Sequence, residues 1–313
     1  SEIQSLNFLI IGFFILQIIV FVPLVTKLLI HQNTHEHLSI FISPLAEAKM
    51  ISESEKSDLI QKPGYIPILI DKYFNDLDGK FSIVIQHFQT GEYYAINEHE
   101  IFQPASLYKL WVMAATMQKV NKGELSKDTQ LTENVQSLHD AFNISSESAE
   151  LINGIISFTV NDAIHQMITI SHNYAALLLS KTIRNKTIQS FLDTNGFYES
   201  KIGQPPQITA ADTALFFEKL YRGELINPES SQEMMKILKN QKIRRKLPKH
   251  LPKNVIIAHK TGELGLYSHD AGIVFHETGD YMIVVLTETQ NPSETEERIA
   301  DFSRDVFMYF TNF

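Results

Sequence analysis

Apolar and polar positions fall into blocks whose period changes along the chain. Residues 8–25, "FLIIGFFILQIIVFVPLV", are interrupted only by Gln17 and Pro23, and an apolar run of this length can cross a bilayer as a helix. It ends without the small-residue pattern of a cleaved signal peptide, so we predict an uncleaved transmembrane anchor over residues 1–30. Lys27 follows the span and no Lys or Arg precedes it, so charge does not predict its orientation.

The blocks that follow are shorter and more polar. Residues 31–62 are mixed in polarity and are predicted to form a spacer. Apolar residues in "IPILIDKYF" (66–74) have helical spacing, whereas "FSIVIQHFQTGEYYAINEHEIF" (81–102) holds two β-rich runs around Thr90 and Gly91. Two such runs joined by a turn predict a β-hairpin.

Helical periodicity dominates the centre of the chain, and strand patterns return towards its end. Helical spacing covers residues 104–209, and a further helix begins at a Thr209 cap and ends near Gly223. Two β-rich segments follow, "NVIIAHKTG" and "DAGIVFHETGDYMIVVLTE", the second with a Thr-Gly turn. The pattern of residues 292–310 predicts a closing helix.

This order of elements predicts an α+β fold. Strands lie on both sides of a long helical region, so we expect one antiparallel sheet built from the two ends of the globular part and flanked by helices. An all-helical subdomain is inserted between those ends. The domain is predicted over 63–313, with 63–103 and 210–313 as the α/β part and 104–209 as the helical part.

Composition and charge narrow the possible functions. The chain has 313 residues, 44% of them hydrophobic, and its formal net charge of −9 gives no reason to expect nucleic-acid binding. The absence of cysteine excludes disulfides, thiolate metal sites and cysteine nucleophiles. Basic residues nevertheless gather in one run: Lys236, Lys239, Lys242, Arg244, Arg245, Lys246, Lys249 and Lys253. We interpret this run as a solvated surface, with an anionic substrate, cell-wall polymer or lipid surface as the alternative.

The first candidate catalytic motif is "PASLYKL", in which Ser106 and Lys109 stand three positions apart. If Pro104 and Ala105 lead into a helix, the serine lies in its first turn and the lysine one turn later on the same face. A lysine kept neutral by burial can activate a serine nucleophile. The alternative is a helix-capping serine beside a solvated lysine, and this motif alone does not decide between them.

A second motif supplies a possible proton relay. "MITISHNYAALLL" places Ser171 and Asn173 at a break between two helical segments. A hydroxyl there could pass a proton to a leaving group, and the amide could hold a substrate carbonyl or the lysine.

A third motif ends an apolar strand. In "AHKTGELG", Lys260 and Thr261 offer a cation and a hydroxyl that can grip a carboxylate, and Gly262 leaves room for substrate along the strand edge. The backbone N–H groups of Ser106 and Glu263 are expected to form an oxyanion hole.

In this order the motifs resemble those of the penicillin-recognising serine hydrolases, specifically the class A β-lactamase family with S-x-x-K, S-D-N and K-T-G. The resemblance covers residues 66–313 and includes "TGEYYAIN", "FTVNDAIHQMITISHN" and "HDAGIVF" around the motifs. It implies a β-lactamase/transpeptidase-like fold. It also implies these roles: Ser106 as the acylated nucleophile, Lys109 as its base or proton relay, Ser171 and Asn173 as the second motif, and Lys260 with Thr261 as the carboxylate grip.

Two departures from the family pattern concern the mechanism. His172 stands where the family usually has aspartate, and we expect it to brace the loop through one tautomer. The family's deacylating glutamate lies in a long loop before Thr209, but the shorter "YESKIGQPP" lacks that context. Glu199, its only acid, is interpreted as an exposed loop residue rather than as the base that activates water.

The resemblance implies a membrane-anchored serine hydrolase that forms an acyl-enzyme through Ser106 and hydrolyses the β-lactam amide bond. The alternative enzyme is a penicillin-binding D,D-carboxypeptidase or endopeptidase acting on peptidoglycan stem peptides. A silent binder of muropeptides or β-lactams is the non-enzymatic alternative, and the intact Ser106, Lys109 and Lys260 argue against it.

The expected partners follow from that function. They are a small-molecule β-lactam or a D-Ala-D-Ala peptide, and the membrane through a single pass, with a monomeric, extracytoplasmic catalytic domain. No cofactor or metal is predicted, because the histidines His31, His35 and His37 crowd into the spacer and are interpreted as part of a polar linker.

Overall fold

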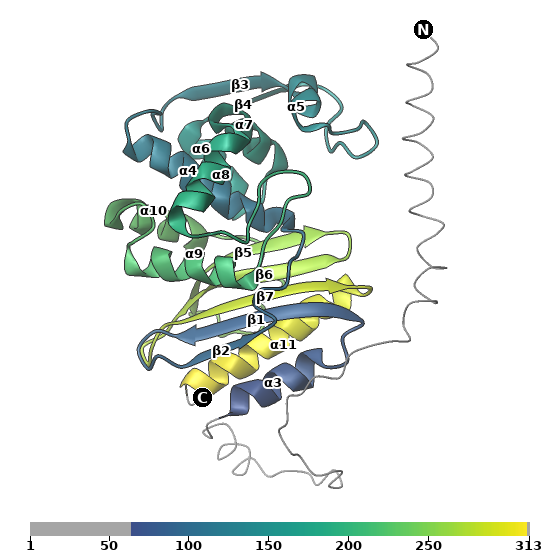
Figure 1. Cartoon of the computed structure of the whole chain (residues 1–313), viewed down its shortest axis with the longest axis vertical. Coiled ribbons are helices and arrows are strands. Elements are labelled where there is room, and N and C mark those ends of the chain that lie inside the picture. Colours follow the sequence, from purple (N-terminus) through teal and green to yellow (C-terminus); the bar gives the residue numbers. More distant parts are fainter. Residues whose placement is uncertain (1–63, 312–313) are drawn as a thin grey trace. The chain divides into compact units, whose positions relative to one another are not determined.

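The framework of the computed structural model, which describes residues 64–311, is a five-stranded antiparallel sheet (Figure 1). Its strands lie in the order β2-β1-β7-β6-β5, with the bounds β1 Gly79–His87, β2 Tyr93–Ile96, β5 Ile256–Leu264, β6 Tyr267–Phe275 and β7 Tyr281–Thr289. The N-terminal hairpin of the domain pairs with the last strand, β1 with β7. The predicted antiparallel sheet from the two ends of the domain is therefore confirmed.

Helices cover both faces of this sheet (Figure 1). The helices on one face are α3 Tyr65–Phe74 and α11 Pro292–Thr311. Those on the other side are α4 Tyr108–Asn121, α5 Val135–Phe142, α6 Val160–Thr169, α7 Asn173–Ile183, α8 Asn185–Asn195, α9 Ala210–Arg222 and α10 Pro228–Lys239, with a 3₁₀ turn, η1 Ala105–Leu107, before α4.

Side chains alternate between the two faces of the sheet along each strand, which explains why helices cover both faces. In β1, Ile83 and Ile85 pack into the core shared with α3 and α11, whereas Val84 between them packs into the opposite core. In β7, Ile283 lies in the first core and Val284 in the second. Because successive side chains of a strand point to opposite faces, burying all of them requires a layer of helices on each side.

Helix α4 is the buried axis of the helical part. All its residues from Lys109 to Met117 are buried, and the Trp111 ring packs against those of Phe197 and Phe216 with centroids 5.0 and 5.3 Å apart. A helix buried on every side is held by packing rather than by its own propensity. The first motif lies at the N-terminal end of this fixed helix.

The prediction that the inserted subdomain is all-helical is wrong. It contains a two-stranded antiparallel sheet of β3 Gln130–Asn134 and β4 Ile155–Thr159, in which Leu131 pairs with Phe158. Each strand has five residues and lies beside a helix, so the helical periodicity of the flanking segments masks the short alternating pattern.

Other predicted elements are confirmed with small shifts in their ends. The hairpin around Thr90 and Gly91 is β1–β2, and the predicted helix at Thr209 is α9. The Thr209 hydroxyl accepts the N–H of Asp212, and Gly223 ends the helix with a φ of 74°, a left-handed conformation that glycine adopts at little cost.

The predicted anchor over residues 1–30 and the spacer over 31–62 lie outside the described residues. Within residues 64–311, no helix combines the length and apolar character that crossing a membrane requires.

We expect Gly272→Ala to lower the free energy of unfolding by about 3 kcal/mol, because β5 and β6 approach closely there. An added Cβ would lie 2.4 Å from the carbonyl oxygen of Ala258 and 2.5 Å from the Cβ of His259. Gly203→Ala is the matched control, since an added Cβ meets no atom within 4 Å. Urea unfolding of both variants checks the prediction, and equal stability would contradict it.

Candidate active site

The turn before α4 presents Ser106 at the surface of a pocket. Ala105 has a φ of 46°, which is uncommon for a residue with a Cβ, and its N–H donates to Oε1 of Gln103 at 2.6 Å. The N–H of Leu107 donates to the carbonyl of Pro104 at 3.0 Å. These bonds fix the turn and leave the half-buried Ser106 at the start of the helix, as its sequence predicts.

Lys109 lies one turn later and is fully buried. Its Nζ donates to the carbonyl of Ser171 at 2.6 Å, to Oγ of Ser171 at 3.1 Å and to Oδ1 of Asn173 at 2.6 Å. Burial lowers its pKa to about 7, against the opposing charge of Glu150. The first two motifs are therefore joined by direct hydrogen bonds, and this lysine can exchange a proton near neutral pH.

The third motif also contacts Ser171, through Lys260. Nζ of Lys260 donates to Oγ of Ser171 at 3.1 Å and to the carbonyl of Thr261 at 2.8 Å. Burial lowers the pKa of Lys260, and the neighbouring charge of Lys109 lowers it further. Oγ of Ser171 thus lies between two lysine amines, and proton transfer through it is geometrically direct.

Ser171 occupies the predicted break between two helices. α6 ends at Thr169, α7 begins at Asn173, and Ser171 has a φ of 61°. His172 caps α7, because its Nδ1 accepts the N–H of Ala175 at 3.2 Å. This bond requires an unprotonated Nδ1, and burial lowers the pKa of His172, which favours that form. Histidine thus braces the loop through one tautomer.

Residues 104–107 form the turn that carries Ser106, the predicted nucleophile, and we call it the nucleophile turn. Strand β5 passes close to this turn at Gly262. A Cβ on this residue would lie 3.1 Å from the carbonyl oxygen of Pro104 and 3.2 Å from Cγ of Leu107. Glycine therefore lets the strand edge approach the residues on both sides of Ser106. This brings the backbone of Glu263 to the same pocket, where it can form the predicted oxyanion hole with Ser106.

Two cations bind the side chain of Glu263, so its carboxylate is not free to act as a base. Oε1 accepts from Lys246 at 2.6 Å, and Oε2 accepts from Arg245. Burial opposes its ionisation, but the charges of Lys246 and Arg245 hold the pKa of Glu263 below its usual value. It therefore stays an ion-paired carboxylate.

The pocket beside Ser106 has a volume of about 340 Å³. Its lining residues come from the nucleophile turn and the start of α4, the end of α5 and the loop after it, α7, the start of α8, the loop before α9 and the end of β5: Gln103, Pro104, Ala105, Ser106, Tyr108, Phe142, Ile144, Asn173, Leu177, Ser180, Asn185, Ile202, Gly203, Gln204, Pro206, Glu263 and Leu264. Lys109, Ser171 and Lys260 lie outside this lining and are linked to it through Asn173. The pocket is mixed in polarity and can hold a small amide substrate.

One acid near the site could not be identified from the sequence alone. Glu150, in the loop between α5 and β4, accepts a hydrogen bond from Nδ2 of Asn173, whose Oδ1 faces Lys109. Glu150 lies in the polar loop "ISSESAELING", where no motif distinguishes it from its neighbours. Glu199 is bound elsewhere, to His99 and to the Thr209 hydroxyl, each at 2.9 Å, and does not line the pocket.

His269 connects the sheet to the nucleophile turn. The N–H of Thr287 donates to its Nδ1 at 3.1 Å, so Nε2 carries the proton and donates to the carbonyl of Gln103 at 2.9 Å. The side chain of Gln103 in turn holds Ala105. The segment "HDAGIVF" contains this histidine, but its role depends on a contact 166 residues away in sequence.

We expect acid to weaken the fold through His269. Burial lowers its pKa from 6.5 to about 4, so on acidification the unfolded chain takes up a proton before the folded one does. Its contribution is complete above about pH 6.5 and falls as the pH approaches 4, a loss of about 2.5 kcal/mol by pH 4.5. His269→Gln should remove this part of the pH dependence in urea unfolding between pH 7.5 and 4.5; an unchanged dependence would contradict the assignment.

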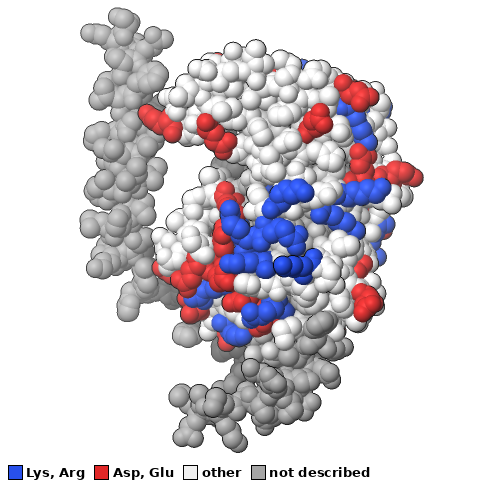
Figure 2. Space-filling view, turned by 180° about the vertical axis from the view of Figure 1, so that it is seen from behind, with Lys and Arg blue, Asp and Glu red and all other residues white. Residues whose placement is uncertain are grey.

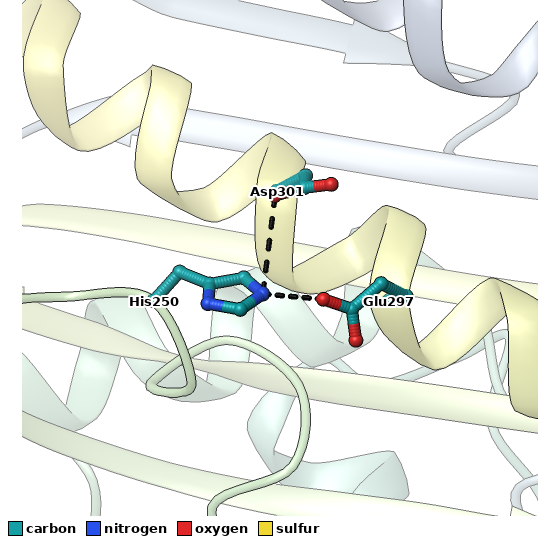
Figure 3. A group of neighbouring side chains, drawn as sticks. All are labelled: His250, Glu297 and Asp301. Atoms are coloured by element: carbon teal, nitrogen blue, oxygen red, sulfur yellow. Dashed lines mark hydrogen bonds and ion pairs between the residues drawn. The ribbon is translucent and has the colours of Figure 1, made fainter.

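A possible set of metal ligands in the described part of the chain lies on the surface between α11 and the loop that precedes β5. Figure 3 shows His250 pointing towards Glu297 and Asp301, whose ligand atoms lie within 4.8 Å of one another. Glu297 also binds Lys249, and Asp301 binds Arg304 at 2.6 Å. Both carboxylates are therefore already neutralised, and we assign the group to an ion-pair network that fastens this loop to α11.

Comparison with known proteins agrees with this geometry. Residues 69–310 match the Beta-lactamase enzyme family. Beta-lactamase VEB-1 of Pseudomonas aeruginosa is 25% identical over 243 residues, covering 69% of this chain and 81% of that protein.

Solved structures share the fold. The beta-lactamase of Sphaerobacter thermophilus aligns with a TM-score of 0.70 and 21% identity, covering 79% of this chain and 97% of that one. A mutant of PBP-A, solved as an acyl-enzyme complex with penicillin-G, aligns with a TM-score of 0.69 and 20% identity over 81% and 99% of the two chains. The match over residues 69–310 shows that the chain belongs to the Beta-lactamase enzyme family, in agreement with the predicted serine hydrolase of the class A type.

Proposed function

We propose that the protein is a membrane-anchored, extracytoplasmic enzyme that forms an acyl-enzyme through Ser106 and hydrolyses the β-lactam amide bond slowly. The observation that carries this proposal is the row of hydrogen bonds from Lys109 through Ser171 to Lys260. The row ends at a strand edge that closely approaches the nucleophile turn at Gly262.

These contacts support the following route to the acyl-enzyme. Neutral Lys109 accepts the proton of the Ser106 hydroxyl as Oγ attacks the amide carbon, and the backbone N–H groups of Ser106 and Glu263 stabilise the oxyanion. When the C–N bond breaks, the hydroxyl of Ser171 gives its proton to the leaving nitrogen and recovers one from Lys109. The Lys260 amine and the Thr261 hydroxyl offer hydrogen-bond donors to a substrate carboxylate at this end of β5.

Deacylation lacks an evident base, which is why the proposed hydrolysis is slow. Glu263 is the one acid among the described residues that line the pocket, and Lys246 and Arg245 bind it. The loop before α9 presents Ile202, Gly203, Gln204 and Pro206, none of which accepts a proton from water. Water activation would then depend on Lys109 itself.

A D,D-carboxypeptidase or endopeptidase acting on stem peptides is the second candidate. The absence of a free carboxylate among the described lining residues favours it, because a long-lived acyl-enzyme suits transfer to a positioned amine or slow release to water. The likeness of the fold to PBP-A is compatible with this activity. The anchor is supported by the apolar run at residues 8–25, and both substrates would be met outside the cytoplasmic membrane.

Stopped-flow kinetics on the detergent-solubilised full chain test the proposal. A penicillin and a cephalosporin should acylate rapidly and clear slowly, so that a burst precedes slow turnover. D-alanine release from a peptide ending in D-Ala-D-Ala, faster than β-lactam turnover, would favour the peptidase. Reversible binding without acylation by any of the three would contradict both enzymatic assignments.

A further inference from the structure

A second pocket, formed by other residues than the pocket at Ser106, is bordered by basic side chains. We call it the basic pocket; it has a volume of about 350 Å³ and is lined by Lys239, Arg244, Pro248, Lys249, Leu251, Lys253, Asn254, Val255, Ile256 and Ile257. It shares no lining residue with the pocket at Ser106. Figure 2 shows Lys and Arg side chains gathered in one patch on this face, with acidic side chains along its border.

The charge of this patch is not balanced within the protein. No Asp or Glu occurs from 234 to 262, although the whole chain carries a net charge of −9. Lys249 pairs with Glu297, but Lys239, Arg244 and Lys253 make no ion pair with any residue of the described part. Three like charges around one cavity repel one another, so an anion bound there is stabilised by all three.

The protein positions Lys239, and the loop that carries two of the other cations, before any ligand arrives. The ammonium of Lys239 lies 3.7 Å from the centre of the Phe275 ring, a contact that positions the side chain without neutralising it. The loop that carries Lys249 and Lys253 is fastened to α11 by the ion pairs of Figure 3, in which His250 contacts Glu297 at 2.5 Å. Leu251, Val255 and Ile257 are buried in the pocket floor.

We propose that the basic pocket binds a phosphate group, carried by a small phosphorylated molecule or a phosphodiester. Arg244 offers a planar fork that matches two phosphate oxygens, and Lys239 and Lys253 add point charges beside it. The cavity suits a compact polyanion, whereas a nucleic-acid backbone needs an extended basic stripe, which the bordering acids interrupt. This inference does not depend on the reaction catalysed at Ser106.

Calorimetric titration of the full chain in neutral detergent tests the proposal, with inorganic diphosphate and glycerophosphoglycerol as the two probes. The double variant Arg244→Gln/Lys253→Gln should weaken binding of the preferred probe at least about tenfold, because each removes a charge-assisted hydrogen bond. Lys122→Gln/Lys186→Gln is the control; it makes the same change of charge at exposed positions outside the pocket and should change affinity less than about twofold.

The two probes distinguish the source of the phosphate. Tighter binding of diphosphate indicates a free phosphorylated compound, and tighter binding of glycerophosphoglycerol indicates a phosphodiester such as that of a lipid headgroup. Binding of neither probe, or equal weakening by the pocket and control variants, would overturn the proposal. Acylation by penicillin should be unchanged in both double variants, so this test and that of the proposed function can fail independently.

Discussion

Replacing Ser106 with alanine should abolish covalent modification by penicillins and lower β-lactam turnover by at least about 10³-fold. Ser106 stands at the pocket surface at the start of α4, and the described pocket lining contains one other hydroxyl of this kind, Ser180. Alanine removes the oxygen that forms the ester but leaves the lysines and the strand edge in place. Reversible binding of the β-lactam should therefore survive, and equilibrium dialysis can measure it.

Ser180→Ala is the matched control for this experiment. Ser180 lines the same pocket from α7 and makes none of the bonds that join the three motifs. This variant should keep its adduct and its turnover within about twofold of the unsubstituted protein. A Ser106→Ala protein that still forms a covalent adduct would show that another residue is the nucleophile.

Lys109→Met should slow acylation by about 10³- to 10⁴-fold. Methionine fills a similar volume at this buried position but cannot accept the proton of Ser106 or return one to Ser171. Ser171 and Asn173 also lose the donor that joins them, so near-ultraviolet circular dichroism should first establish that the variant is folded. Lys119→Met, on the outer end of the same helix where Lys119 pairs with Glu124, is the control and should acylate at the normal rate.

The pH dependence of acylation separates a base from a purely structural lysine. Burial lowers the pKa of Lys109 to about 7, so the neutral form that accepts a proton grows about tenfold between pH 6 and pH 8. The acylation rate should rise with it and level off above pH 8. The slow residual rate of Lys109→Met should lack this rise, and a variant that retains it would assign the titration to another group.

Much of the fold could be predicted from the sequence, because its strands and helices carry strong periodic patterns. Hairpin β1–β2, helix α9 and the closing helix each combine an apolar period with turn or cap residues, such as Thr90 with Gly91 and Thr209 with Gly223. Strands β3 and β4 were missed, since five residues give too few repeats to outweigh the helical pattern around them.

The candidate site was predictable where chemistry follows from short motifs and not where it depends on distant contacts. Ser106 with Lys109, Ser171 with Asn173, and Lys260 are recognisable in the sequence, and the structure joins the last four in one hydrogen-bonded row. Glu150 contacts Asn173 and His269 contacts Gln103 only after the chain has folded, so no local spacing in the sequence identifies them.

Intact-mass measurement over time with a penicillin tests most directly whether Ser106 becomes acylated. The full chain should gain the mass of one penicillin within seconds and lose it slowly, and peptide mapping should place the adduct on the segment that contains Ser106. The same mass gain followed by rapid loss would preserve the nucleophile but contradict slow hydrolysis. No mass gain, or an adduct on another segment, would contradict the assignment of Ser106.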